Sequence, residues 1–116
     1  NFLQINVTGF FKQTKSFKED YKIMRADGKT ILDYESPLMK LHIEQGSDNT
    51  ITTVTAPEGR LRIEQSSNLV DYQLSTSEGS LHMVKEKGQI YQDYQGDEEE
   101  LKNTLNYILE VYKNKL

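Results

Sequence analysis

The chain has 116 residues, a length typical of one domain, and its composition of 35% hydrophobic and 28% charged residues is not that of a disordered chain. A formal net charge of -4 argues against a general nucleic-acid binder, because such proteins neutralise phosphates with clustered Lys and Arg. The chain has no Cys, which excludes disulfides, thiolate metal sites and a Cys nucleophile. No run approaches the roughly 20 apolar residues of a membrane-spanning helix.

Residues 1–16 read as an N-terminal strand followed by a connection, with apolar Phe2, Ile5 and Val7. The chain begins at Asn1 rather than at Met, which is typical of a mature form after removal of a leader, although a trimmed start explains it as well. We therefore favour an extracytoplasmic or cell-surface-anchored location, including a lipoprotein, over a cytoplasmic one.

Residues 17–96 contain four 20-residue units, each with the pattern of a β-hairpin. The segment from Pro37 to Gln45 recurs as Pro57 to Gln65, with a shared Leu-x-Ile-Glu-Gln core. Turn-forming residues recur about every ten positions, which is the spacing of an antiparallel meander. The repeat reflects either duplication or the periodicity of any meander, and both interpretations give the same alternation of side chains.

Asp27-Gly28 is typical of a two-residue type I′ turn, which requires positive φ at both positions. That turn predicts the register of the first hairpin, in which Ile23 faces Leu32 on an apolar face. The same arithmetic at Lys87-Gly88 pairs Leu81 with Tyr94 on the apolar face, and His82 with Asp93 on the polar face.

Residues 97–116 predict an amphipathic helix with Asp97 as its N-cap, and the apolar positions are Leu101, Leu105, Ile108 and Tyr112. A helix of this length spans about 27 Å, whereas eight strands span about 38 Å. The fold class is therefore mainly β: an antiparallel meander of about eight to nine strands, curled or barrel-like, packed against a C-terminal helix. We expect the sheet to curl, to close or to leave apolar surface uncovered.

No catalytic, phosphate-binding or metal-binding motif occurs in the sequence, so we expect a non-enzymatic protein without a metal or cofactor. His42 and His82 occupy equivalent repeat positions, but four strands separate them by about 19 Å, too far for two ligands of one metal. Glu64 and Asp71 face each other across a hairpin, where solvent screening favours an incidental pair over a catalytic dyad.

The leading hypothesis is a binding module that holds an apolar or amphipathic, lipid-like ligand between the sheet and the helix. Tyr side chains among aliphatic ones offer contact area together with a polar group. The alternative for each residue is an ordinary core position. The predicted lining residues are Tyr21, Tyr34, Tyr72, Tyr94, Leu41, Leu61 and Leu81.

The alternative function is a protein-interaction or adaptor domain that acts through an exposed sheet edge or a basic N-terminal patch. The patch is formed by Lys12, Lys15, Lys18, Lys22 and Arg25, and its own alternative is a Lys-protected edge strand. The stretch from Gly9 to Ser36 resembles the opening hairpin of pleckstrin-homology domains, which also end in an amphipathic helix. The helix here lacks that family's usual Trp, and the strands are too many for a seven-stranded barrel, so the resemblance serves only as an analogy.

Overall fold

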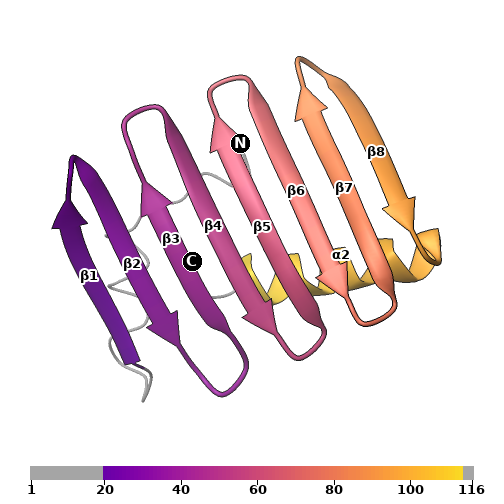
Figure 1. Ribbon diagram of the computed structural model, residues 1–116, viewed down its shortest axis with the longest axis horizontal. Helices are drawn as coiled ribbons and strands as arrows, with labels where there is room; N and C mark the ends of the chain where they lie inside the picture. The colour runs from indigo at the N-terminus through magenta and orange to yellow at the C-terminus, as the bar shows by residue number, and fades with distance from the viewer. Residues whose placement is uncertain (1–19, 114–116) are drawn as a thin grey trace.

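The computed structural model describes the backbone of residues 20–113 and the side chains of residues 22–112. Within these residues it consists of one eight-stranded antiparallel sheet, with strands adjacent in chain order, and one helix (Figure 1). The elements are β1 (Asp20–Ala26), β2 (Lys29–Glu35), β3 (Lys40–Gln45), β4 (Asn49–Ala56), β5 (Gly59–Ser66), β6 (Leu69–Thr76), β7 (Gly79–Glu86), β8 (Gln89–Gln95) and α2 (Glu98–Lys113). The predicted meander is confirmed. The sheet stays open rather than closing into a barrel, and β1 and β8 are its edge strands.

Two-residue turns set the register of the first and last hairpins. Asp27 and Lys87 have φ of 53° and 49°, and the glycines after them have φ of 74° and 80°, the positive values that a type I′ turn needs. As predicted, Ile23 pairs with Leu32. Leu81 likewise pairs with Tyr94 in the last hairpin.

One face of the sheet, hereafter the inner face, carries the hydrophobic core. Its side chains form two rows that run across neighbouring strands, because opposite residues in each pair point to the same side. The first row comprises Tyr34, Leu41, Val54, Leu61, Leu74 and Leu81; the second comprises Leu32, Ile43, Thr52, Ile63 and Tyr72. All of these side chains are buried.

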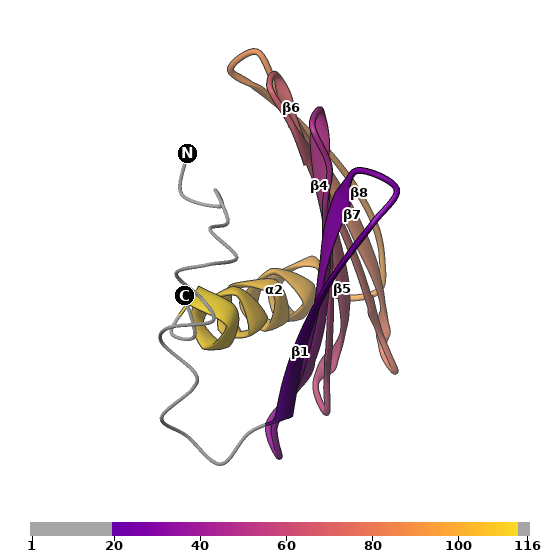
Figure 2. The same cartoon turned by 90° about the vertical axis from the view of Figure 1, so that its left-hand side faces the viewer.

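The helix α2 lies on the inner face and packs across β4 to β7 (Figure 2). Asp97 is its N-cap: the Asp97 Oδ1 atom accepts a hydrogen bond of 3.0 Å from the backbone N–H of Glu100. The predicted apolar stripe is confirmed, and Leu109 joins it. Leu101, Leu105, Ile108, Leu109 and Tyr112 are all buried against the sheet.

The opposite face of the sheet, hereafter the outer face, carries no described element over it (Figure 2). The side chains that point to the outer face are mostly polar, as the alternation in the sequence predicts. The strand predicted within residues 1–16 lies outside the described residues.

Candidate functional site

A groove remains on the inner face where α2 does not cover the sheet. Its volume is about 450 Å³, and it lies between α2 and strands β6, β7 and β8. The lining residues are Tyr72, Met83, Lys85, Ile90, Gln92, Lys102, Leu105, Asn106, Leu109 and Glu110. Apolar side chains thus come from both the sheet and the helix, and charged groups come from β7 and the helix.

Tyr72 contributes a buried aromatic ring to this groove. No described residue forms a hydrogen bond with its hydroxyl group. Burial raises the pKa of Tyr72 to about 12, so the hydroxyl is protonated at neutral pH and is a hydrogen-bond donor. The ammonium nitrogen of Lys85 lies 5.7 Å from the centre of the ring, a cation–π distance.

The polar groups of the groove differ in their partners. Lys102 Nζ lies 2.8 Å from Glu98 Oε2, in an ion pair between residues one helical turn apart. Gln92 Nε2 donates a hydrogen bond of 3.2 Å to the same oxygen. Two polar residues of the groove, Gln92 of β8 and Lys102 of α2, are therefore both held by Glu98 in the first turn of α2.

The seven predicted ligand-lining residues occupy three different environments. Tyr34, Leu41, Leu61, Tyr72 and Leu81 are buried in the core, and of these Tyr72 alone lines the groove. Tyr94 is exposed, because it lies on the outermost strand. The side chain of Tyr21 lies outside the described part of the chain.

The prediction from sequence did not include most of the groove residues, such as Met83, Ile90 and Leu105. Ile90 offered a signal in the sequence, because the alternation from the Lys87-Gly88 turn places this apolar residue on the inner face of the last strand. The position of the helix, which decides what stays open, was not encoded in that alternation.

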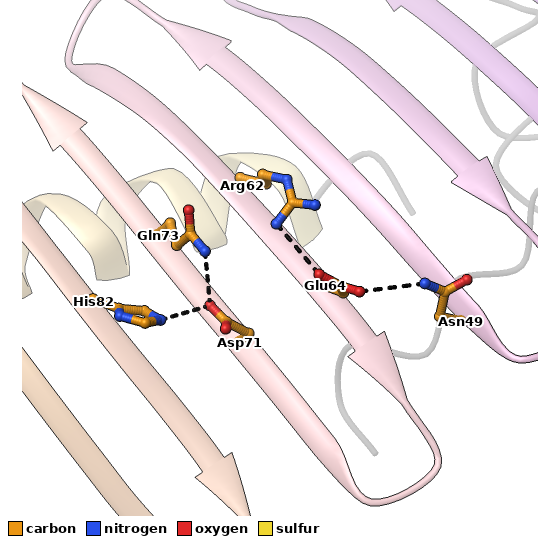
Figure 3. Close-up of polar contacts among 6 residues, drawn as sticks. All are labelled: Asn49, Arg62, Glu64, Asp71, Gln73 and His82. Carbon is orange, nitrogen blue, oxygen red and sulfur yellow. Dashed lines mark hydrogen bonds and ion pairs between the residues drawn. The ribbon is translucent and has the colours of Figure 1, made fainter.

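Figure 3 shows two separate polar clusters on the outer face, each centred on one carboxylate. Glu64 Oε2 accepts a hydrogen bond of 3.3 Å from Asn49, and Glu64 Oε1 accepts one of 3.4 Å from Arg62. Asp71 Oδ1 is bonded by Gln73 at 3.4 Å and by His82 at 3.0 Å. Glu64 and Asp71 face each other as predicted, but each is held by its own donors.

The register places His82 opposite Asp93 as predicted, but His82 hydrogen-bonds Asp71 on the other neighbouring strand instead. The predicted cross-strand pair of His82 with Asp93 is therefore confirmed in the register, while the side-chain hydrogen bond of His82 goes to Asp71. An outer-face side chain can turn to either neighbouring strand, and the register alone does not choose between them.

His42 lies between two carboxylates on the outer face. Its Nδ1 donates to Asp33 Oδ1 at 2.5 Å and its Nε2 donates to Glu44 Oε2 at 3.0 Å. Both ring nitrogens are donors only in the protonated imidazole. The hydrogen bond to Asp33 raises the pKa of His42 above its ordinary value of 6.5, against the opposing effect of partial burial, and Glu44 adds to the rise.

The chain was also compared with protein-family models, curated proteins and solved structures. No match was found. Any proposed function therefore rests on the geometry of this molecule. Within residues 22–112, no group of His, Asp and Glu side chains is arranged to hold a metal ion. The described helix is not long and apolar enough to cross a membrane.

A second depression, open and of about 690 Å³, lies on the outer face over β1 to β5. Lys22, Lys40 and Arg60 line it together with Asp33 and Glu35, so its charges are mixed. Of the predicted basic patch, Lys22 and Arg25 are exposed on β1, whereas Lys12, Lys15 and Lys18 lie outside the described residues.

Proposed function

We propose that the protein is a non-enzymatic binding module for an amphipathic ligand, held in the groove between α2 and strands β6 to β8. The observation that carries the proposal is a groove of about 450 Å³ to which both the sheet and the helix contribute apolar side chains. Ligand sites in proteins are typically concave, largely apolar and about 300–1,000 Å³ in volume.

The chemistry of the lining favours a ligand with an apolar chain and an anionic head group. The chain would contact the apolar lining residues, which include Met83, Leu105 and Leu109. An anionic head group would be attracted to the ammonium group of Lys85.

The test measures binding of decanoate and of uncharged decanol by isothermal titration calorimetry. We expect both to bind with a negative change in heat capacity, because apolar surface is buried. Decanoate should bind more tightly than decanol, and Lys85→Gln should remove this difference. Loss of the difference identifies the ammonium group as the source of selectivity.

A pair of Trp variants on the helix tests the location. Asn106 is exposed and lines the groove, so Asn106→Trp should fill it and weaken decanoate binding at least tenfold. Asn103 is also exposed, one turn earlier and outside the groove lining, so Asn103→Trp should leave the affinity unchanged. Equal binding by both variants, or no binding by the unchanged protein, would contradict the proposal.

A further inference from the structure

The last strand, β8, is the most exposed strand for which all side chains are described. All seven of its residues are exposed, on both faces of the sheet. Ile90, Tyr91 and Tyr94 are 61%, 55% and 42% exposed, a concentration of large apolar side chains on one short strand. Scattered exposed apolar residues need no explanation, but three on an edge strand mark a surface that can associate.

Among the described strands, β7 alone pairs with β8, and the other edge of β8 carries no strand. Counting from the two-residue turn at Lys87-Gly88, the alternate residues Ile90, Gln92 and Tyr94 direct their N–H and C=O groups away from β7. Proteins usually protect such an edge with Lys, Pro or a bulge. The strand Gln89–Gln95 contains neither Lys nor Pro, and its register with β7 is uninterrupted.

We propose that β8 pairs with β8 of a second copy of this chain, in antiparallel orientation, to form a symmetric dimer. The symmetry axis would pass beside Gln92, the middle residue of the strand. In this register Ile90, Gln92 and Tyr94 face Tyr94, Gln92 and Ile90 of the second copy, so every outward-directed backbone group finds a partner. The two sheets would continue as one, and two-fold symmetry closes the assembly at two copies.

The side chains support this register over the one centred on Asp93. On the inner face each Ile90 would lie beside Tyr94 of the second copy, an aliphatic–aromatic pair that stabilises antiparallel sheets. On the outer face each Tyr91 would lie beside Asp93 of the second copy. A shift that centres the axis on Asp93 instead would place two carboxylates directly opposite each other, which is unfavourable.

The ends of the interface carry complementary charge. In the register centred on Gln92, the end of β8 and the acidic residues after it would lie near the Lys87-Gly88 turn of the second copy. Asp97 is followed by the acidic first turn of α2, Glu98 to Glu100, and Lys87 projects from the exposed turn before β8. Two such contacts occur in each dimer, one at each end. Electrostatic attraction at both ends therefore favours the second copy as the occupant of this edge.

The interface is short, which sets the expected affinity. A strand of seven residues is about 24 Å long. Such a contact is at the small end of specific interfaces, which are weak and transient. We therefore expect a dissociation constant on the order of tens of micromolar.

Analytical ultracentrifugation of the full chain, from about 1 µM to 1 mM, tests the proposal with variants at two positions. Tyr91→Asp places a carboxylate opposite Asp93 twice per dimer and should raise the dissociation constant about tenfold, which is about 1.4 kcal/mol for the two like-charge pairs together. Tyr91→Lys places an ammonium opposite Asp93 and should preserve or tighten the dimer. The double variant Tyr91→Asp/Asp93→Lys should restore it.

A matched change on the opposite edge is the control. Met24 of β1 is 49% exposed on the outer face, so Met24→Asp should leave dimerisation unchanged. If Met24→Asp weakens association as much as Tyr91→Asp does, the copies join head to tail through β1, and the symmetric dimer is wrong. A chain that stays monomeric at 1 mM would also overturn the proposal. Circular dichroism on each variant separates loss of association from loss of folding, and no ligand enters the assay.

Hydrogen exchange by NMR gives a second readout that needs no substitution. In the dimer the amides of Ile90, Gln92 and Tyr94 should become protected as the protein concentration rises, while the amides of Tyr91 and Asp93, already directed to β7, should change little. If the exchange rates of all five amides stay the same at every protein concentration, pairing through this edge is contradicted.

Discussion

Gly79, the first residue of β7, should be the least replaceable glycine in the sheet. Its φ is 150°, a value that residues with a side chain rarely adopt. A Cβ there would lie 1.9 Å from the carbonyl oxygen of Gln95. That oxygen belongs to the backbone at the end of β8, so it cannot move without displacing the connection to α2. Gly79→Ala therefore combines backbone strain of about 1–3 kcal/mol with overpacking of about 1–3 kcal/mol.

Two other glycines separate these contributions. Gly88 has a φ of 80°, but a Cβ there would meet no atom of the described residues within 4 Å, so Gly88→Ala should cost only about 1 kcal/mol of conformational strain. Gly59 occupies the repeat position equivalent to Gly79 without the positive φ, and its Cβ would lie 2.8 Å from the Ser75 carbonyl oxygen. Gly59→Ala should cost about 1–3 kcal/mol from crowding alone.

Urea unfolding followed by tyrosine fluorescence measures the three changes. We expect Gly79→Ala to lose roughly 4 kcal/mol of unfolding free energy, a large part of the roughly 6–17 kcal/mol expected for a chain of this length. The loss of unfolding free energy should be largest for Gly79→Ala, smaller for Gly59→Ala and smallest for Gly88→Ala. The slope of the unfolding free energy against urea concentration should not change. A Gly79→Ala loss within about 1 kcal/mol of the Gly88→Ala loss would refute the reasoning.

Two further predictions concern His42 and Asp97. Because the folded-state pKa of His42 lies above 6.5, its contribution to stability should be complete below pH 6.5 and disappear as the pH rises through the raised pKa. Unfolding measured across this interval should show that loss, and Asp33→Asn, which removes the main cause, should reduce it and lower the pKa of His42 in an NMR titration. Asp97→Ala should lower the unfolding free energy by about 0.5–2 kcal/mol by removing the N-cap, whereas Asp97→Asn should lose much less.

The strand order, the registers and the helix followed from short-range signals in the sequence. Asp27-Gly28 and Lys87-Gly88 define turns whose geometry propagates along both strands, because a shift by one residue would turn every side chain to the other face. The helix boundary followed from Asp97, whose side chain can satisfy a free N–H group at the helix start. Local chemistry is sufficient for these features.

The candidate site depends on long-range packing, which alternation does not encode. Tyr72 and Tyr94 both occupy inner-face positions, yet one is buried and the other exposed, because α2 packs across β4 to β7 rather than over β8. The helix direction is set at Gly96, whose φ is 119° and whose Cβ would lie 2.6 Å from the Glu78 carbonyl oxygen. A glycine can mark such a connection in the sequence, but the angle of the helix that follows requires the whole fold.

The two proposals meet at β8 and are linked through Ile90. This residue lines the groove, and in the proposed dimer Tyr94 of the second copy would lie beside it. If that contact changes the affinity for ligand, linkage requires the ligand to change the dimerisation constant by the same factor. Decanoate titrations at protein concentrations below and above the dimerisation constant would then give different affinities, and Tyr91→Asp should remove the difference because Tyr91 does not line the groove. Equal affinities at both concentrations would mean that the groove and the edge work independently, even though they share a strand.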